Sequence, residues 1–221
     1  ALAVLEFQDA LEIDPNAATI HVSIADGYRR LGRSKHAENH LEIAISLDSN
    51  DITAREMLGQ LYLLNRQYKL AENQFLALSK IDFNNDNYLS ILGDLAKLQK
   101  EWNKSIDFYL KAYQINPQNF KVLESAMQVC LSVELFKKAE QICKMLVDYN
   151  INNSSYWLTY KQITAYNKNY YSTMEAIAEL ERINGRSIKL SLEKSAIMQE
   201  LNKVDEAIKL LVEVHNPCLL Y

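Results

Sequence analysis

The stretch Ile52–Asn85, ITAREMLGQLYLLNRQYKLAENQFLALSKIDFNN, decides the fold of this chain. Apolar residues recur in it at helical spacing, first as Leu58, Leu61, Tyr62 and Leu64 and then as Leu70, Ala71, Phe75, Leu78 and Ile81. A polar turn at residues 65–67 separates the two runs, and Asp51 is placed to cap the first helix by accepting a hydrogen bond from its free amide groups. The sequence therefore predicts two antiparallel helices joined by a short turn.

The key residues of this hairpin recur at a spacing of 34 along the whole chain. The column that contains Ala71 holds only small residues, which are Ala3, Ala37, Ser105, Ala139, Thr173 and Ala207. Small side chains are expected where two helices cross closely, because extra volume at such a crossing costs about 1–3 kcal/mol. The columns of Phe75 and Leu78 are apolar throughout, and the column of Ile81 is apolar except at Pro217. The hairpin is therefore predicted to repeat.

This pattern resembles the tetratricopeptide repeat (TPR), whose signature places an aromatic residue, Leu-Gly, Tyr, Ala, Phe, Ala and Pro at fixed offsets. Repeats 18–51, 52–85 and 86–119 match it well, through Tyr28, Ala37 and Ala44, then Gly59, Tyr62, Ala71 and Phe75, then Gly93, Ala112 and Pro117. Repeats 120–153, 154–187 and 188–221 depart further, since Met127 and Lys161 occupy the glycine position. The resemblance implies an all-α fold, a right-handed α-solenoid of stacked antiparallel helix pairs.

We expect one solenoid domain over residues 1–221, made of a half repeat at 1–17 and the six repeats above. Because residues 1–17 supply only a second helix, we expect the chain to be a piece of a longer protein. The sequence therefore gives no compartment, and a cytoplasmic location is only a default. Without a polar capping helix, we expect the chain to continue beyond Tyr221, to fold its tail back, or to self-associate through its uncapped ends.

Composition and charge narrow the possible partners. The chain is 48% hydrophobic and 24% charged, and its 5 glycines and 3 prolines are few for a strand-and-turn architecture. Its net charge of −4 argues against nucleic acid as a partner, because phosphate binding depends on clustered Lys and Arg. No run of about 20 apolar residues is present, so we predict no direct insertion into a membrane.

The sequence offers little for catalysis, cofactors or metals. His36 and His40 have the i, i+4 spacing of many zinc ligands, but Glu38 is not where a zinc peptidase places its general base, and His21 is isolated. We therefore predict that His36 and His40 lie on the outer face of their helix and hold no metal. No acid, base and nucleophile converge, and no glycine-rich loop is present, so we expect no cofactor and no enzymatic activity.

Two further features each leave two interpretations open. Cys130 and Cys143 are expected to be buried apolar groups, although their positions on paired helices would also allow a disulfide. Six aromatic residues crowd one repeat as core filling or as a partner-binding surface, and they are Tyr156, Trp157, Tyr160, Tyr166, Tyr170 and Tyr171. Among these, Tyr166 and Tyr171 are the least expected in the core.

The resemblance implies that the first helix of each repeat lines a concave groove. By helical spacing, the predicted partner-binding residues are Asp26, Glu56, Met57, Gln60, Ile91, Asp94, Glu124, Gln128, Leu158, Gln162 and Leu192. This set lacks the Lys, Asn and Arg arrangement of carboxylate-clamp co-chaperones, and also the asparagine ladder of O-linked glycosyltransferases. It suits a peptide or protein segment with apolar anchors and basic residues, although an inert solvated face would look similar.

Two classes of function follow from this sequence. The first is a non-enzymatic scaffold or adaptor that binds a protein segment in its groove. The second is the substrate-docking or regulatory arm of a longer enzyme, such as a transferase, whose catalytic domain lies outside these residues.

Overall fold

The computed structural model describes the backbone of residues 2–215, and near the two ends it describes the side chains of residues 6, 7 and 9–213. Within residues 2–215 the chain is helical, with short turns and no strand, which confirms the predicted all-α class. The first seven helices are α1 (Leu2–Ile13), α2 (Ala18–Arg30), α3 (Ser34–Leu47), α4 (Ile52–Leu64), α5 (Tyr68–Ile81), α6 (Asp86–Leu98) and α7 (Trp102–Ile115). The others are α8 (Lys121–Ser132), α9 (Phe136–Tyr149), α10 (Ser154–Tyr166), α11 (Tyr170–Asn184), α12 (Ile188–Glu200) and α13 (Val204–His215).

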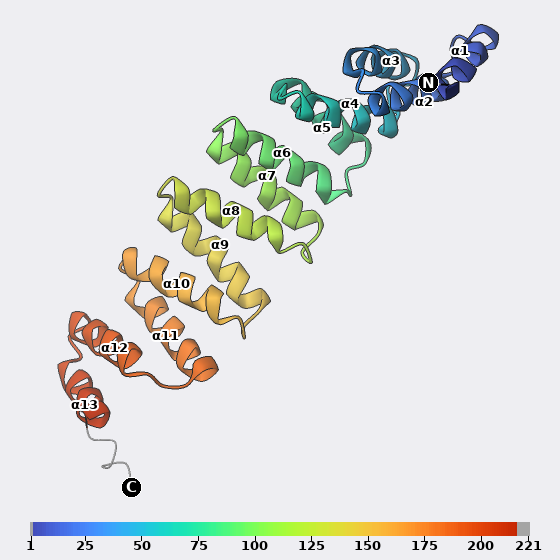
Figure 1. Ribbon diagram of the computed structural model, residues 1–221. Helices are drawn as coiled ribbons and strands as arrows, with labels where there is room; N and C mark the ends of the chain where they lie inside the picture. Colours follow the sequence, from blue (N-terminus) through green and yellow to red (C-terminus); the bar gives the residue numbers. More distant parts are fainter. Residues whose placement is uncertain (1, 216–221) are drawn as a thin grey trace. The chain divides into compact units, whose positions relative to one another are not determined.

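The chain divides into two compact units, Ala1–Gln118 and Asn119–Tyr221, called unit 1 and unit 2 below. Within each unit the most extensive contacts join the two helices of a pair, as in α4–α5 and α6–α7 of unit 1 and α10–α11 of unit 2 (Figure 1). Successive pairs are joined by contacts between α3 and α4, α5 and α6, α9 and α10, and α11 and α12. Each unit is therefore a run of stacked helix pairs, as in an α-solenoid. The single-domain organisation over residues 1–221 stays a prediction.

The small-residue column lies at the helix crossings, as predicted. Its described members are at most 2% exposed, and they are Ala37, Ala71, Ser105, Ala139, Thr173 and Ala207. The side chain of Ala3 and all of Pro217 lie outside the described residues. Burial of the column allows the two helices of a pair to approach closely, so the large residues beside it can form the core.

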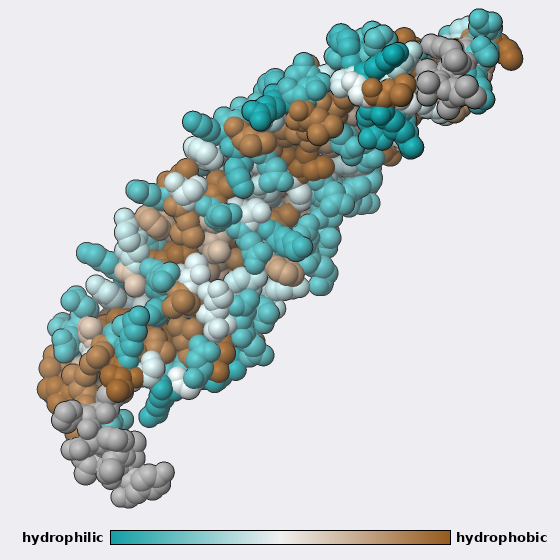
Figure 2. All heavy atoms as spheres, in the orientation of Figure 1, coloured by the Kyte–Doolittle hydropathy of each residue, from teal (hydrophilic) through white to brown (hydrophobic). Residues whose placement is uncertain are grey.

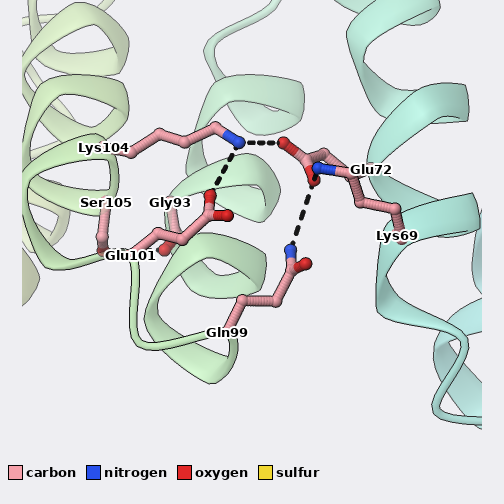
Figure 3. A network of polar contacts seen from close by, with 7 residues as sticks. All are labelled: Lys69, Glu72, Gly93, Gln99, Glu101, Lys104 and Ser105. Atoms are coloured by element: carbon pink, nitrogen blue, oxygen red, sulfur yellow. Dashed lines mark hydrogen bonds and ion pairs between the residues drawn. The ribbon is translucent and has the colours of Figure 1, made fainter.

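Glycine is required where an aromatic ring crosses the first helix. A Cβ on Gly59 would lie 2.9 Å from Cε2 of Phe75, and a Cβ on Gly93 would lie 2.5 Å from Cε1 of Tyr109. Both distances are shorter than real Cβ contacts. The Ser105 hydroxyl also donates to the Gly93 carbonyl at 2.8 Å, which ties α7 to α6 across the same crossing (Figure 3).

The turn within each pair has a repeated geometry. The residue two positions after the first helix has a positive φ in every described pair, at Gly32, Arg66, Lys100, Glu134, Lys168 and Asn202. The next amide donates back into that helix, as Gln67 N–H does to the Tyr62 carbonyl at 2.8 Å. These bonds satisfy carbonyls that would otherwise be free at the helix end. The predicted Asp51 cap is confirmed, since its carboxylate accepts from the Ala54 amide at 2.9 Å.

Candidate functional site

The first helices of unit 1 carry six of the predicted partner-binding residues. We call this set the unit 1 row, and its members are Asp26 on α2, Glu56, Met57 and Gln60 on α4, and Ile91 and Asp94 on α6. Gln60 and Asp94 are exposed, whereas Met57 and Ile91 are half-buried and pack against the core of the unit. The row therefore offers part of two apolar side chains between polar ones. Figure 2 shows apolar and polar side chains interspersed in this way over the face in view.

Two carboxylates of this row are held by tyrosine hydroxyls. Tyr88 donates to Glu56 at 2.6 Å, and Tyr109 donates to Asp94 at 2.6 Å. Burial, followed by the hydrogen bond to Glu56, raises the pKa of Tyr88 well above its ordinary value. Since the neutral tyrosine hydroxyl fixes a carboxylate without cancelling its charge, both side chains keep their negative charge in a defined position.

Asp26 differs from the other two acids of this row. Its carboxylate accepts from Arg29 at 2.5 Å and from Arg30 at 2.7 Å, both on its own helix. The hydrogen bond from Arg29 is the largest influence, and the pKa of Asp26 lies below its ordinary value. Its charge is therefore compensated locally, so Asp26 contributes less to the attraction of a basic partner than the sequence suggested.

The first helices of unit 2 carry the other five predicted residues. We call this set the unit 2 row, and its members are Glu124 and Gln128 on α8, Leu158 and Gln162 on α10, and Leu192 on α12. Leu158 is 45% exposed and Leu192 is 51% exposed, so both are available to a partner. Glu124 accepts from the Tyr156 hydroxyl at 2.6 Å. At the position of α10 that corresponds to Gly93 of α6, Lys161 is buried and forms an ion pair with Glu193.

The same bond between neighbouring repeats therefore occurs once in each unit. Glu56 and Glu124 are 68 residues apart, and so are their donors Tyr88 and Tyr156. The 34-residue columns did not reveal this pair, because it recurs only in every second repeat. Pairs of residues that recur together at twice the repeat length would have been the signal.

A buried carboxylate on α5 of unit 1 contacts both α7 and the α6–α7 turn. Glu72 on α5 forms ion pairs with Lys104 and with Lys69, the latter at 3.2 Å, and accepts from Gln99 at 3.3 Å (Figure 3). Burial alone would raise the pKa of Glu72, but the hydrogen bonds from Lys104, Gln99 and Lys69 outweigh it and hold the pKa below its ordinary value. The network joins two successive pairs and sequence analysis missed it.

Substituting Lys104 with Met is expected to lower the free energy of unfolding by about 2 kcal/mol, because it removes the main partner of a buried carboxylate. This expected loss is smaller than the loss for a fully buried ion pair, because the Lys104 side chain is 38% exposed. Because the folded-state pKa of Glu72 lies below its unfolded value, the network's contribution is complete at neutral pH and is lost as the pH falls through the folded-state pKa. Urea unfolding at neutral and acid pH, with exposed Lys97→Met as the control, measures both effects. Equal losses in the two variants would contradict the prediction.

The aromatic cluster divides into core and surface. Trp157 is 2% exposed and Tyr160 is 4% exposed, so these two rings fill the core. Tyr166 and Tyr171 are 65% and 75% exposed, which agrees with the prediction that they lie outside the core. The Tyr166 ring packs on Phe136 with 3.9 Å between ring centroids, which leaves a two-ring surface feature on unit 2.

The expectation for two of the histidines was wrong. His21 is not isolated but buried, and its Nδ1 lies 3.0 Å from Nδ1 of His40, which is itself half-buried. Burial, and then the neighbouring His21 and His36, lower the pKa of His40. Two imidazoles share one hydrogen bond here, and no group of three metal-ligating side chains is found among the described residues.

The two described cysteines are buried and free rather than bridged. Burial raises the pKa of the Cys143 thiol to about 12, so it is not a reactive nucleophile. None of the described helices is both long and apolar enough to cross a membrane.

Comparison with known proteins rests on structure alone, since no protein-family model and no curated protein matches the sequence. A C-terminal part of a TPR repeat-containing protein from Cytophaga hutchinsonii is similar, with a TM-score of 0.59 and 16% identity over 97% of this chain and 90% of that one. YrrB, described as a TPR protein with an unusual peptide-binding site, has a TM-score of 0.57 and 16% identity over 85% of this chain and 96% of its own.

A third similar structure is that of Naa15/Naa10 bound to HypK-THB, with a TM-score of 0.65 and 15% identity. The match covers 96% of this chain but only 33% of that one. Identities this low establish a common fold and nothing further. Together with the small-residue column buried at the crossings, they show that the chain has the fold of TPR proteins, an α-solenoid of helix pairs.

Proposed function

We propose that this chain is a non-enzymatic scaffold that binds a segment of another protein along its first-helix rows. The observation that carries the proposal is the pair of fixed carboxylates in unit 1, Glu56 and Asp94, which lie on the same two helices as the half-buried Met57 and Ile91. Side chains already held in place lose less conformational freedom when a partner binds. The peptide-binding site ascribed to YrrB, which has the same fold, supports such a use of the architecture.

The partner's chemistry follows from the same residues. Met57 and Ile91 would contact apolar anchors and supply most of the affinity, while Glu56 and Asp94 would attract basic residues and speed the encounter. In unit 2, Leu158 and Leu192 offer more exposed apolar surface, and Glu124 is the fixed carboxylate. Each row therefore suits an extended or helical segment that carries apolar and basic side chains.

The double variant Met57→Asp with Ile91→Asp is expected to bind the chain's protein partner with at least a tenfold lower affinity, because charges replace the apolar side chains that would contact the partner's anchors. Quantitative pull-down followed by a binding titration of the captured protein measures this loss. The control is Phe83→Asp, since Phe83 is 69% exposed in unit 1 but lies outside the row. Capture unchanged by the double variant, or lost equally in the control, would contradict the proposal.

Met57 and Ile91 also pack on the core, so the first variant could lose binding because it misfolds. A second variant tests the proposal without changing these two residues. Glu56→Gln with Asp94→Asn removes both charges but leaves an oxygen to accept from each tyrosine. It is expected to slow association several-fold at low salt and to have little effect at high salt, where such attraction is screened. An association rate that is unchanged at low salt would remove the electrostatic half of the proposal.

A further inference from the structure

Unit 2 has an open cavity beside α9, which Tyr160 of α10 also lines. Its volume is about 600 Å³, and α9 lines it with Lys137, Glu140 and Lys144 while the α10–α11 turn lines it with Asn167 and Asn169. None of these residues belongs to the unit 2 row on the first helices. The cavity is therefore a feature separate from the proposed groove.

Glu140 is the only carboxylate among the residues that line this cavity. It accepts from the side-chain amides of Asn167 and Asn169, each at 2.6 Å. Among the described residues, no lysine or arginine lies within ion-pair distance of it. Two neutral amides fix this carboxylate, and its charge remains uncompensated by a direct cation.

The corresponding carboxylate of unit 1 shows which partners surround such a group elsewhere in the chain. Glu140 corresponds to Glu72, which lies 68 residues earlier. Asn167 corresponds to Gln99, whose amide donates to Glu72, and Lys137 corresponds to Lys69, which forms an ion pair with it. The ammonium of Lys104 completes that network (Figure 3). At the position of Lys104, unit 2 has Ser172.

Ser172 is too short to reach across as Lys104 does, and the lysines already in the cavity do not replace that cation. Lys144 is engaged with Glu175 at 2.8 Å and with Asp148 at 3.4 Å. Lys137 on the same helix does not exclude a second cation, because its counterpart Lys69 contacts Glu72 together with Lys104. Unit 2 therefore has the acceptor and the space, but not the lysine.

We propose that the Glu140 cavity binds the ammonium group of a lysine side chain from a protein partner. The lysine would occupy the space that Lys104 fills in unit 1, with Glu140 as its acceptor. A second cavity of about 460 Å³ shares Lys137 and Asn167 with the first and is lined by Phe136 and Tyr166. These two packed rings place an apolar surface beside the ammonium site, so an apolar residue next to the lysine fits the partner segment.

The direct test uses N-acetyl-lysine methylamide as the probe, with N-acetyl-norleucine methylamide as the matched probe that lacks the ammonium. Binding is followed by NMR through the side-chain amide signals of Asn167 and Asn169. We expect saturable shifts with the lysine probe and none with the norleucine probe. Glu140→Gln is expected to weaken lysine binding at least tenfold. Absence of saturable shifts, or equal shifts with both probes, would overturn the proposal.

Ser172→Lys supplies the missing lysine within the chain, at the cost of the hydrogen bond between the Ser172 side chain and the Tyr160 hydroxyl. This variant is expected to lose binding of the lysine probe at least tenfold and to melt at a higher temperature. The reciprocal variant Lys104→Ser is expected to create lysine binding in unit 1, seen at the Gln99 side-chain amide. Lysine binding that survives in Ser172→Lys would overturn the proposal. The groove residues are intact in all these variants, so failure of this proposal and failure of the proposed function are distinguishable.

Discussion

Replacing Trp157 with alanine is expected to lower the free energy of unfolding of this protein by about 3–5 kcal/mol, the usual cost of removing a large buried aromatic side chain. The ring is 2% exposed and is among the largest fully buried side chains of the described chain. Its Nε1 donates to the Ile151 carbonyl at 2.7 Å, and the ammonium of Lys144 lies over the ring at 5.6 Å from its centroid. Alanine would remove these contacts and leave a cavity between α9 and α10.

Urea unfolding followed by far-ultraviolet circular dichroism measures this change. The matched control is Tyr166→Ala, which removes an aromatic ring of the same repeat that is 65% exposed. The control is expected to cost less than about 1 kcal/mol, because most of that ring is already in water. Similar losses in both variants would show that the aromatic cluster does not divide into core and surface as described.

The fold could be predicted from the sequence because its main constraint acts on side-chain volume. A close helix crossing accepts only small residues, so Ala71 and its counterparts are visible as a column at a spacing of 34. The same constraint made Gly59 informative, since the Phe75 ring occupies the space where a Cβ would lie. Residue type determines side-chain volume, so a volume constraint that recurs in every repeat appears in the sequence as a recurring residue type.

The turns could not be predicted in the same way. The positive-φ position holds glycine at Gly32 but Arg66, Lys100 and Glu134 in the following pairs. A non-glycine residue pays a strain cost there, and the hydrogen bonds that close each turn offset it. Because backbone hydrogen bonds offset the strain, residues other than glycine are accepted there, and the residue type does not reveal the positive φ.

The polar contacts of the site were also hidden, for a different reason. Tyr88 and Glu56 are 32 residues apart, as are Lys104 and Glu72, so each bond depends on how one helix pair stacks on the next. The His21 to His40 contact likewise joins residues 19 positions apart. Sequence reasoning placed the partner-binding residues on the first helices but could not say which of them are committed to neighbours. Their role in binding stays a prediction.

The glycine position provides the second large effect. Replacing Gly93 with methionine is expected to destabilise unit 1 by about 3 kcal/mol, because overpacking a close crossing displaces side chains and backbone. A Cβ alone would already lie 2.5 Å from Cε1 of Tyr109, and methionine adds three further heavy atoms. The better helix propensity of methionine offsets less than about 1 kcal/mol of this cost. Asn87→Met, at an exposed position of the same helix, is expected to change stability by less than about 0.5 kcal/mol.

Unit 2 indicates how the loss can be recovered. There the glycine position holds Met127, and the residue that corresponds to Tyr109 is the buried Cys143. A large residue in the first helix is thus matched by a small one in the second.

Tyr109→Cys alone is expected to cost about 3 kcal/mol, since it leaves a cavity and removes the hydroxyl that donates to Asp94. Combined with Gly93→Met, it is expected to cost about 1–3 kcal/mol less than the sum of the two single losses. Urea unfolding of the four proteins gives this coupling energy, and strict additivity would show that the pairing of volumes across the crossing is not what the glycine position responds to.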